Sequence, residues 1–529
     1  MVVRGFTRIG AVAAVLILAV GACSSGDSSA DSEIPGLDDS ALEVMNQPAY
    51  SNAQWLISVQ DIDTGEILID LDADRMAEPG SAMKSYSMGA AWLEWGPDHT
   101  IVTPVKRTGE IVDGTLLGDV ILVGQGDITM GGRTEADGTV DFANLDHNDA
   151  NPLPGATLTP EDPLTGLNEL AVQVKQSGVD RVSGQVVVDD RLFQSSLAGE
   201  PITPIVINQN IIDLTTTPAD VGETATVVMS PAVAPWRVTS EVETVAPGGD
   251  TEISVSSPVE GTLLLSGTIA ADSQPALKVH VLEDPSTFAR TAFIEALGRA
   301  GVAVGGDPVA PNSTASLADI DAVTALPSVA ELTSLPFDQD ATYVLKVSYN
   351  RGAQTMICML AVEGGGYDAD APEGSECDAG LVEAQELWSA AGLDTTSVAM
   401  IDGSGLEGNY VTPNNQTELQ TIMANRPDAD RWKATLPILG VDGSLAQVQP
   451  DSPAAGKVVA KTGSLVDGDT FNNRIRLNTK ALGGYIDAES GRRLAFTIIV
   501  NQGFFSEIEG VFDANEDVGK VAAIIQQSY

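Results

Sequence analysis

Histidine and cysteine are scarce in this chain of 529 residues, which contains three of each. Zinc sites in proteins are built from clusters of these two residue types, so the composition argues against such a site and we predict no metal ligands. The chain also lacks a G-x-S-x-G elbow, the motif that presents a serine to a histidine base in α/β-hydrolases. With histidines only at His99, His147 and His280, a serine nucleophile in this chain favours a different base.

Basic residues are few as well. The chain has 27 lysines and arginines against 74 aspartates and glutamates, a formal net charge of −47. A nucleic-acid-binding protein needs a basic face, and an anionic membrane surface attracts basic segments, so this charge argues against both partners. The content of 43% hydrophobic and 19% charged residues is typical of a globular protein, and the acidic excess favours solubility through self-repulsion.

The apolar run near the N-terminus is short. "AVAAVLILAV", residues 11–20, has ten residues, about half of what a membrane-spanning helix requires. Arginines precede it and small residues follow it, a pattern that indicates a signal peptide over residues 1–22. The "VGAC" that ends at Cys23 resembles a bacterial lipobox, in which the cysteine is lipidated. Plain cleavage after Ala22 is the alternative, and residues 23–40 are predicted to be a flexible tether.

The remaining cysteines are Cys358 and Cys377. An exported chain meets oxidising surroundings, so these two residues are candidates for a disulfide. Two unpaired thiols are the alternative that the sequence leaves open.

Strand and helix patterns at the two ends enclose a β-rich middle. Residues 53–71 predict a hairpin, and near the C-terminus "GKVVAKTGSLV" predicts a strand that a second hairpin and a helix over residues 511–527 follow. Residues 99–283 contain many short β runs broken by glycine and aspartate. We therefore predict an α/β (α+β) domain over residues 41–98 and 284–529, interrupted by inserted β-rich domains over residues 99–283.

One short segment combines a serine and a lysine at a predicted helix start. In "EPGSAMKSYSMG", Ser81 precedes Lys84 by three positions, which places both side chains on one face of a helix. A lysine serves as a base for serine when burial or a neighbouring cation lowers its pKa. The backbone N–H groups at a helix start can also stabilise an oxyanion. The alternative reading makes Ser81 a simple N-cap.

Two further motifs follow in order, Ser348-Tyr349-Asn350 and Lys461-Thr462-Gly463. S-x-x-K, S-x-N and K-T-G in this order form the motif set of penicillin-binding proteins and serine β-lactamases. The gap between the first two motifs is far longer here than in a class A β-lactamase. It is similar to that of the D-alanyl-D-alanine carboxypeptidase/endopeptidase family of the penicillin-binding protein 4 type, peptidase family S13. The segments "GDVILVGQGDITM", "VSGQVVVDDRLF" and "DGSGLEGNYVTP" also resemble that family.

The resemblance implies a transpeptidase-like domain of the penicillin-binding-protein and serine β-lactamase fold, split by one or two smaller β-rich domains. It implies that Ser81 attacks the peptide bond between two D-alanines and that Lys84 is the general base. Ser348 then relays a proton to the leaving amine and Asn350 orients the substrate amide. It also implies that Lys461 supplies positive charge for the terminal carboxylate of the substrate.

The same resemblance implies that Thr462, Gly463 and Ser464 bind substrate, with Thr462 on the carboxylate and the Ser464 N–H in the oxyanion hole. No cofactor is implied. The expected partners are peptidoglycan stem peptides, β-lactams as acylating inhibitors, and the extracytoplasmic face of a bacterial membrane through a lipid anchor. The alternatives are a β-lactamase or esterase on the same fold, or a non-catalytic lipoprotein that binds the cell wall.

Two features outside the motifs are open to more than one interpretation. The family often has an Ala-Glu pair after S-x-N, whereas this chain has Arg351-Gly352-Ala353-Gln354. Arg351 is interpreted as a solvated surface residue, with a cation beside the substrate as the alternative. Asp402 and Ser404 lie in a glycine-rich loop, where a structural turn is favoured over a catalytic role.

Overall fold

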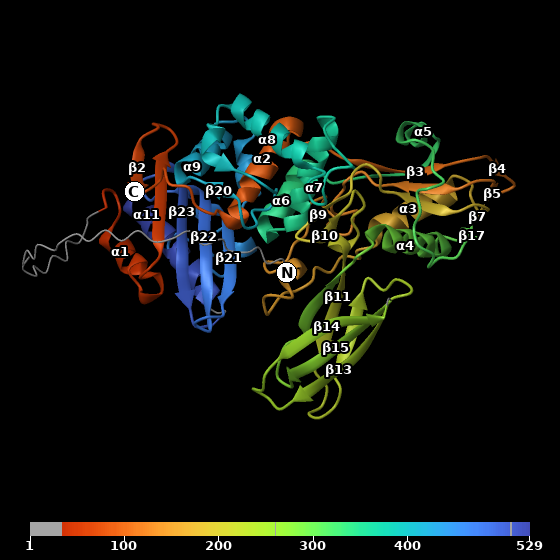
Figure 1. Cartoon of the computed structure of the whole chain (residues 1–529), viewed down its shortest axis with the longest axis horizontal. Helices are drawn as coiled ribbons and strands as arrows, with labels where there is room; N and C mark the ends of the chain where they lie inside the picture. The colour runs from red at the N-terminus through yellow and green to blue at the C-terminus, as the bar shows by residue number, and fades with distance from the viewer. Residues whose placement is uncertain (1–33, 260, 508–509) are drawn as a thin grey trace, which may run out of the picture.

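A five-stranded antiparallel sheet forms the centre of the computed structural model, which describes residues 34–259, 261–507 and 510–529 (Figure 1). Its strand order is β2-β1-β23-β22-β21, so the first hairpin of the chain pairs with the last three strands. Both predicted hairpins are confirmed. The strands are β1 (Gln54–Asp61), β2 (Ile67–Leu71), β21 (Val458–Asp469), β22 (Arg474–Asp487) and β23 (Arg493–Phe505).

Helices cover both faces of this sheet. Because successive strand residues point to opposite faces, Ile499 of β23 lies in the core on one side and Ile498 in the core on the other. One face is covered by α1 (Asp39–Met45) and α11 (Gly510–Ser528). The other is covered by α2 (Lys84–Trp95), α6 (Phe337–Val347), α7 (Asn350–Glu363), α8 (Asp378–Ala391), α9 (Pro413–Ala424) and α10 (Ala429–Ala434).

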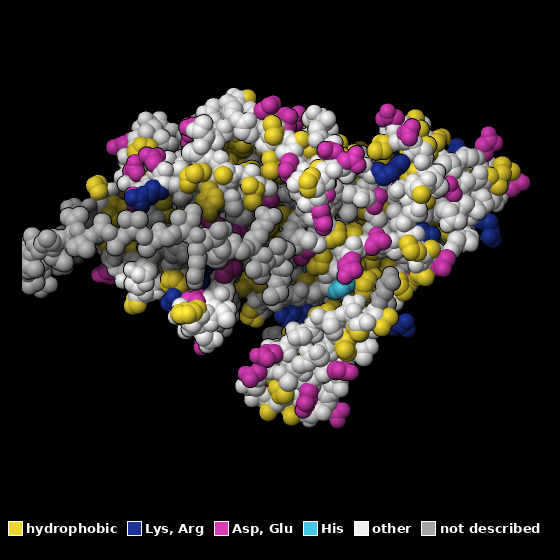
Figure 2. Space-filling model, in the orientation of Figure 1, with side chains coloured by type: hydrophobic (Ala, Val, Ile, Leu, Met, Phe, Trp, Pro, Cys, Tyr) yellow, Lys and Arg dark blue, Asp and Glu magenta, His cyan; other side chains and the backbone are white. Residues whose placement is uncertain are grey.

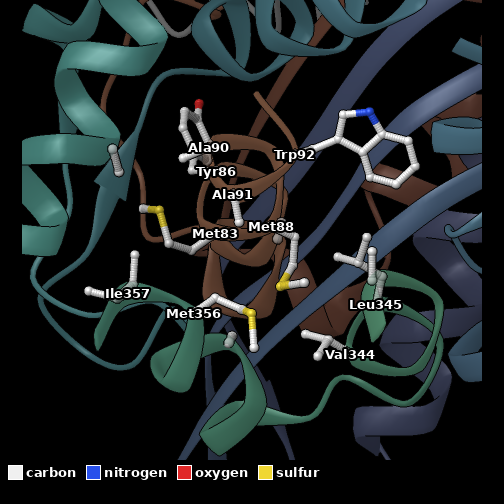
Figure 3. Close-up of a cluster of buried hydrophobic side chains, with 14 of the residues drawn as sticks. Met83, Tyr86, Met88, Ala90, Ala91, Trp92, Val344, Leu345, Met356 and Ile357 are labelled. Carbon is white, nitrogen blue, oxygen red and sulfur yellow. The ribbon is translucent and has the colours of Figure 1, made fainter. Parts of the chain in front are cut away.

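The central helix is α2, in which every residue from Lys84 to Trp92 is buried. Its side chains meet those of α6 and α7 in one apolar cluster, with Met88 near Leu345 and Met356 (Figure 3). Packing therefore surrounds this helix along most of its length. Its small residues allow the close approach, since a side chain at Gly89 would collide with the Trp388 ring.

The segment between the two parts of this region, residues 102–333, is called the insertion below. One sheet has the order β18-β3-β6-β8, and α3 (Thr165–Gln176) and α4 (Pro285–Arg299) pack on it. Its strands are β3 (Val102–Arg107), β6 (Val120–Val123), β8 (Val186–Asp189) and β18 (Ser328–Thr333). A small sheet, β17-β7-β5-β4, flanks it with β4 (Ile111–Val112), β5 (Thr115–Leu116), β7 (Arg181–Val182) and β17 (Ala303–Val304), and α5 (Ile320–Thr324) lies nearby.

The insertion also contains two three-stranded sheets, of which the second projects away from the rest of the molecule (Figure 1). They contain β11 (Ile211–Thr217), β12 (Thr226–Ser230) and β16 (Ala276–Val281), then β13 (Arg237–Val245), β14 (Glu252–Val259) and β15 (Thr262–Ala270). The remaining strands form two short two-stranded sheets. One pairs β9 (Ser195–Leu197) with β10 (Glu200–Ile202), and the other pairs β19 (Val398–Ala399) with β20 (Tyr410–Val411). Acidic side chains are distributed over the visible face rather than gathered in one patch (Figure 2).

Two predicted boundaries need correction. The insertion does not end at residue 283, because β18 pairs with β3 and the apolar face of α4 completes the insertion's core. The tether does not extend to residue 40, because Leu37 is buried and α1 begins at Asp39. The predicted signal peptide, residues 1–22, and Cys23 lie outside the described residues.

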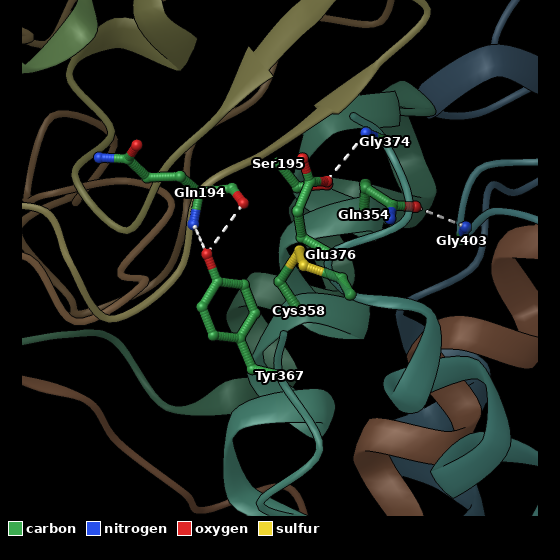
Figure 4. The surroundings of a disulfide bond; sticks show 9 residues. Gln194, Ser195, Gln354, Cys358, Tyr367, Gly374, Glu376 and Gly403 are labelled. Carbon is green, nitrogen blue, oxygen red and sulfur yellow. Dashed lines mark hydrogen bonds between the residues drawn. A yellow bond between two sulfur atoms is a disulfide. The ribbon is translucent and has the colours of Figure 1, made fainter. Parts of the chain in front are cut away.

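A disulfide joins Cys358 in the middle of α7 to Cys377 at the start of α8. The loop between these helices contacts the insertion on its other side (Figure 4). The Tyr367 hydroxyl donates to Gln194 O at 3.1 Å, and the Ser195 hydroxyl donates to the Glu376 carboxylate at 2.7 Å. The disulfide therefore holds in place a loop that connects the insertion to α7, the helix that begins at Asn350.

Replacing Cys358 and Cys377 together with alanine should lower the free energy of unfolding by about 3 kcal/mol, because the bond spans 19 residues and restricts the unfolded chain. Chemical denaturation measures this change. The control is Cys23→Ala, which removes a cysteine outside the described residues and should leave unfolding unchanged. Titration of two reactive thiols in the denatured parent, beyond that of Cys23, would instead support unpaired cysteines.

Candidate active site

Ser81 lies in a 3-10 turn, η2 (Gly80–Met83), that runs directly into α2. Strand β21 packs against this turn without room for side chains. A Cβ on Gly463 would lie 1.9 Å from Pro79 O, and one on Gly80, which has φ +52°, would lie 2.6 Å from Ser464 N. These glycines allow the contact that brings the backbone of Ser464 to the turn carrying Ser81. Neither η2 nor α2 has a side-chain N-cap, so the N-cap reading of Ser81 is wrong.

The amine of Lys84 is fully buried beneath Ser81. Its Nζ lies 2.7 Å from Ser81 Oγ, 2.6 Å from Asn350 Oδ1 and 2.9 Å from Ser404 O. All three partners are uncharged groups. Burial lowers the pKa of Lys84 to about 7, although the carboxylates of Asp402 and Asp149 oppose the shift.

The glycine-rich loop fixes one of these three partners. Asp402 Oδ1 accepts hydrogen bonds from the N–H groups of Ser404 and Gly405, at 2.7 and 2.8 Å. The Ser87 hydroxyl donates to Gly403 O at 2.6 Å, and Gly403 N–H donates to Gln354 Oε1 (Figure 4). The predicted structural turn is therefore present, and it also directs the Ser404 carbonyl to Lys84.

The S-x-N motif forms the junction between α6 and α7. Ser348 ends α6 in the left-handed region, with φ +62°, a conformation that costs a non-glycine residue about 1–2 kcal/mol. This bend places Asn350 at the first turn of α7 and directs Ser348 Oγ to Lys461 Nζ at 2.9 Å. Lys461 also donates to Thr462 O at 2.9 Å. Burial, then the charges of Lys84 and Lys480, lower the pKa of Lys461 well below its usual value.

A cleft of about 510 Å³ opens over these residues. Its wall includes Ser81, Ser348, Asn350, Thr462 and Ser464, which belong to the three predicted motifs or follow them directly. The structure thus brings the predicted catalytic residues to one place, with Lys84 and Lys461 beneath the surface. Among the described residues, no group of three or more histidine, cysteine, aspartate or glutamate side chains is placed to hold a metal ion.

Asp149 is a residue of the cleft that the sequence motifs did not predict. It ends a short turn of the insertion, η3 (His147–Asp149), and lines the cleft beside Asn350. Burial raises its pKa to about 6, while the charges of Lys84 and Lys461 act in the opposite direction. No local motif marks this residue, because only the tertiary fold brings the insertion to the cleft.

Lys480 was missed too. It pairs with Ser464 across β21 and β22, is 5% exposed, and donates to Ser464 Oγ at 2.7 Å. A signal was present in the sequence, since a lone lysine in a strand that is otherwise buried needs a partner.

The surface interpretation of Arg351 is wrong. Its side chain is buried beside a second, smaller cavity and forms an ion pair with Glu200 of the insertion at 2.5 Å. Arg351 therefore connects α7 to the insertion, a contact that local sequence could not indicate.

Three features of this site occur together. A serine lies beside a buried lysine at a helix start, a second serine faces another buried lysine, and a K-T-G strand packs against the same turn. Together they define a serine enzyme of the penicillin-binding class. The arrangement places a serine hydroxyl, a buried lysine amine with a lowered pKa and further hydroxyl groups at one cleft.

Comparison with known sequences identifies the family. The profile of the D-Ala-D-Ala carboxypeptidase 3 (S13) family matches residues 38–516. The chain belongs to this family and is a serine-type D-Ala-D-Ala carboxypeptidase. It is 28% identical over 490 residues to the D-alanyl-D-alanine carboxypeptidase of Actinomadura sp. (strain R39), covering 87% of this chain and 79% of that protein. It is 20% identical over 481 residues to the D-alanyl-D-alanine carboxypeptidase DacB of Haemophilus influenzae, covering 86% of each.

Solved structures support the same fold. The crystal structure of penicillin binding protein 4 from Haemophilus influenzae matches with a TM-score of 0.65 at 17% identity, covering 91% of this chain and 98% of that one. The same protein complexed with a β-lactam also matches with a TM-score of 0.65, at 18% identity, with the same coverage. The predicted α/β fold with a long β-rich insertion is confirmed.

Proposed function

We propose that Ser81 is the nucleophile that cleaves the terminal D-Ala-D-Ala bond of peptidoglycan stem peptides, and that Lys84 is its base. The observation that carries the proposal is the 2.7 Å contact between Lys84 Nζ and Ser81 Oγ. A neutral lysine amine has two N–H donors and one lone pair. With the donors on Asn350 Oδ1 and Ser404 O, the lone pair is left for the Ser81 hydroxyl proton.

The reaction then follows from proton transfers within the cleft. Ser81 Oγ bonds to the substrate carbonyl carbon as its proton passes to Lys84, and the oxyanion is stabilised by the N–H groups of Ser81 and Ser464. The C–N bond breaks as the leaving amine receives the proton that Lys84 took from Ser81, relayed by the Ser348 hydroxyl, which accepts a hydrogen bond from Lys461. Water then attacks the acyl-enzyme, releasing the shortened peptide and restoring Ser81.

The same geometry suits acylation by β-lactams. A related protein has been solved with a β-lactam bound, and a β-lactam carbonyl can react with Ser81 as the peptide carbonyl does. We further propose that residues 34–98 and 334–529 form the catalytic domain, and that residues 102–333 form the inserted domains, since sheet pairing separates the two sets.

Ser81→Ala should abolish covalent labelling by penicillin, measured as the mass of the intact protein. Ser85→Ala is a matched control, because Ser85 lies one turn further along α2, is buried, and its hydroxyl makes no hydrogen bond within the described residues. It should label like the parent. Labelling of the Ser81→Ala variant would defeat the nucleophile assignment. Absence of labelling in the parent would favour a non-catalytic binding protein, and rapid turnover of penicillin would favour a β-lactamase.

The rate of acylation should depend on pH through Lys84. The neutral amine is the active form, so the rate should fall about tenfold per pH unit below the Lys84 pKa of about 7 and level off above it. Acylation by a chromogenic β-lactam, followed over a pH series, measures this. Lys84→Met should lose acylation at every pH. A rate in the parent that rises toward acid pH would contradict the role of Lys84 as base.

We also propose that the chain is exported and lipidated on Cys23, as its lipobox-like sequence suggests. Over the three described ranges, no helix is both long and apolar enough to cross a membrane. The parent should incorporate labelled palmitate when expressed in a bacterial host and remain in the membrane fraction, whereas Cys23→Ala should not incorporate the label. Ser25→Ala is the control and should be labelled normally. A parent without label would support plain cleavage after Ala22.

A further inference from the structure

Three lysines are buried at this site, and they differ in what their amines face. Lys84 faces Ser81, and Lys461 faces Ser348 and the carbonyl of Thr462. Neither amine belongs to the wall of the cleft, whereas Lys480 does. Among the described residues that line the cleft, Lys480 is the only basic one and Asp149 the only acidic one.

This placement bears on the terminal carboxylate of the substrate. The family resemblance assigned the positive charge for that carboxylate to Lys461. In the structure, Lys461 has 0% exposure and its amine lies within hydrogen-bond distance of two oxygens of the protein itself. Its geometry suits a role in the proton path through Ser348, and the cation that a ligand in the cleft can reach is Lys480.

The groups around Lys480 form a site for an anion. Thr462 and Ser464 are two residues apart on β21, so their hydroxyls point to one side of the strand. Ser444 Oγ lies 2.8 Å from Thr462 Oγ1, and Lys480 donates to Ser464 Oγ. The cleft wall therefore carries a row of three hydroxyls, at Ser444, Thr462 and Ser464, that ends at an ammonium group.

The ammonium has capacity left for a ligand. A lysine ammonium has three N–H donors, and over the described ranges Lys480 makes one hydrogen bond and no ion pair. Burial lowers its pKa to about 7. A buried cation with few partners is costly, and an anion bound in the cleft would relieve that cost through charge-assisted hydrogen bonds.

We propose that Lys480, together with the hydroxyls of Thr462 and Ser464, binds the C-terminal carboxylate of the substrate. This inference rests on the proposed function, because it assigns the carboxylate end of the same peptide. Lys480 is thus a specificity residue that selects a free terminal carboxylate over a neutral end.

The test uses a matched pair of acyl-D-alanine thioesters. One has a thioglycolate leaving group that ends in a free carboxylate, and the other has the corresponding carboxamide. Both are activated, so acylation of Ser81 is measurable for each. The variants are Lys480→Gln, which keeps a polar side chain near Ser464 but removes the charge, and Lys480→Arg, which keeps the charge. Lys433→Met is the control, since Lys433 pairs with Asp487 away from the cleft and its loss changes the net charge equally.

Lys480→Gln should lower kcat/KM for the carboxylate substrate about 10- to 100-fold, mainly through KM, because a hydrogen bond to a charged group is lost. It should leave kcat/KM for the carboxamide nearly unchanged. Lys480→Arg should retain most of the preference for the carboxylate, and Lys433→Met should behave like the parent.

Equal losses on both substrates would show that Lys480 only holds Ser464 in place, and no loss on either would remove it from binding. Each result overturns the inference. A parent that hydrolyses neither thioester and is not labelled by penicillin would instead overturn the proposed function, so the two failures are distinguishable.

Discussion

The site depends on an amine kept in the protein interior by uncharged partners. Lys84 sits among Ser81 Oγ, Asn350 Oδ1 and Ser404 O, and an ion pair in their place would hold the proton on the lysine. Three separate segments supply these oxygens: the η2 turn, the start of α7 and the glycine-rich loop. The close packing around α2 excludes water from this amine, and that burial lowers the pKa of Lys84.

The insertion is part of the same arrangement. Arg133 donates to both oxygens of Asp146, at 2.7 and 2.8 Å, and the adjacent His147 ring contacts Asp213 of β11 at 2.9 Å. These buried contacts fix η3, which ends at Asp149 on the cleft wall. Asn148 Nδ2 also donates to Val347 O, next to Ser348. Buried charged groups that are paired in this way give a rigid, specific geometry. The insertion, which begins shortly after α2 in the sequence, therefore contributes to the cleft.

Much of the site was predictable because its chemistry is local. The spacing of Ser81 and Lys84 depends on one helical turn, and K-T-G requires a glycine where β21 touches η2. The hairpins and the final helix follow from side-chain periodicity and length. Asp149 and Arg351 were not predictable from local sequence. Asp149 belongs to the insertion but lines a cleft formed by the other region, and the partner of Arg351, Glu200, lies in the insertion. The end of the insertion was misplaced because the sequence of α4 predicts a helix without saying which sheet the helix covers. Lys480 was detectable only as a polar residue in a buried strand.

The three lysines also constrain one another. Besides burial, the charges of Lys84 and Lys480 lower the pKa of Lys461, so the protonation state of Lys461 depends on the other two amines. A carboxylate bound at Lys480 would keep a proton on that amine, because the opposite charges attract. Neutral Lys461 still has N–H donors for Ser348 Oγ and gains a lone pair, which lets it exchange a proton with that hydroxyl. A peptide without the carboxylate would lack this charge-assisted contact with Lys480.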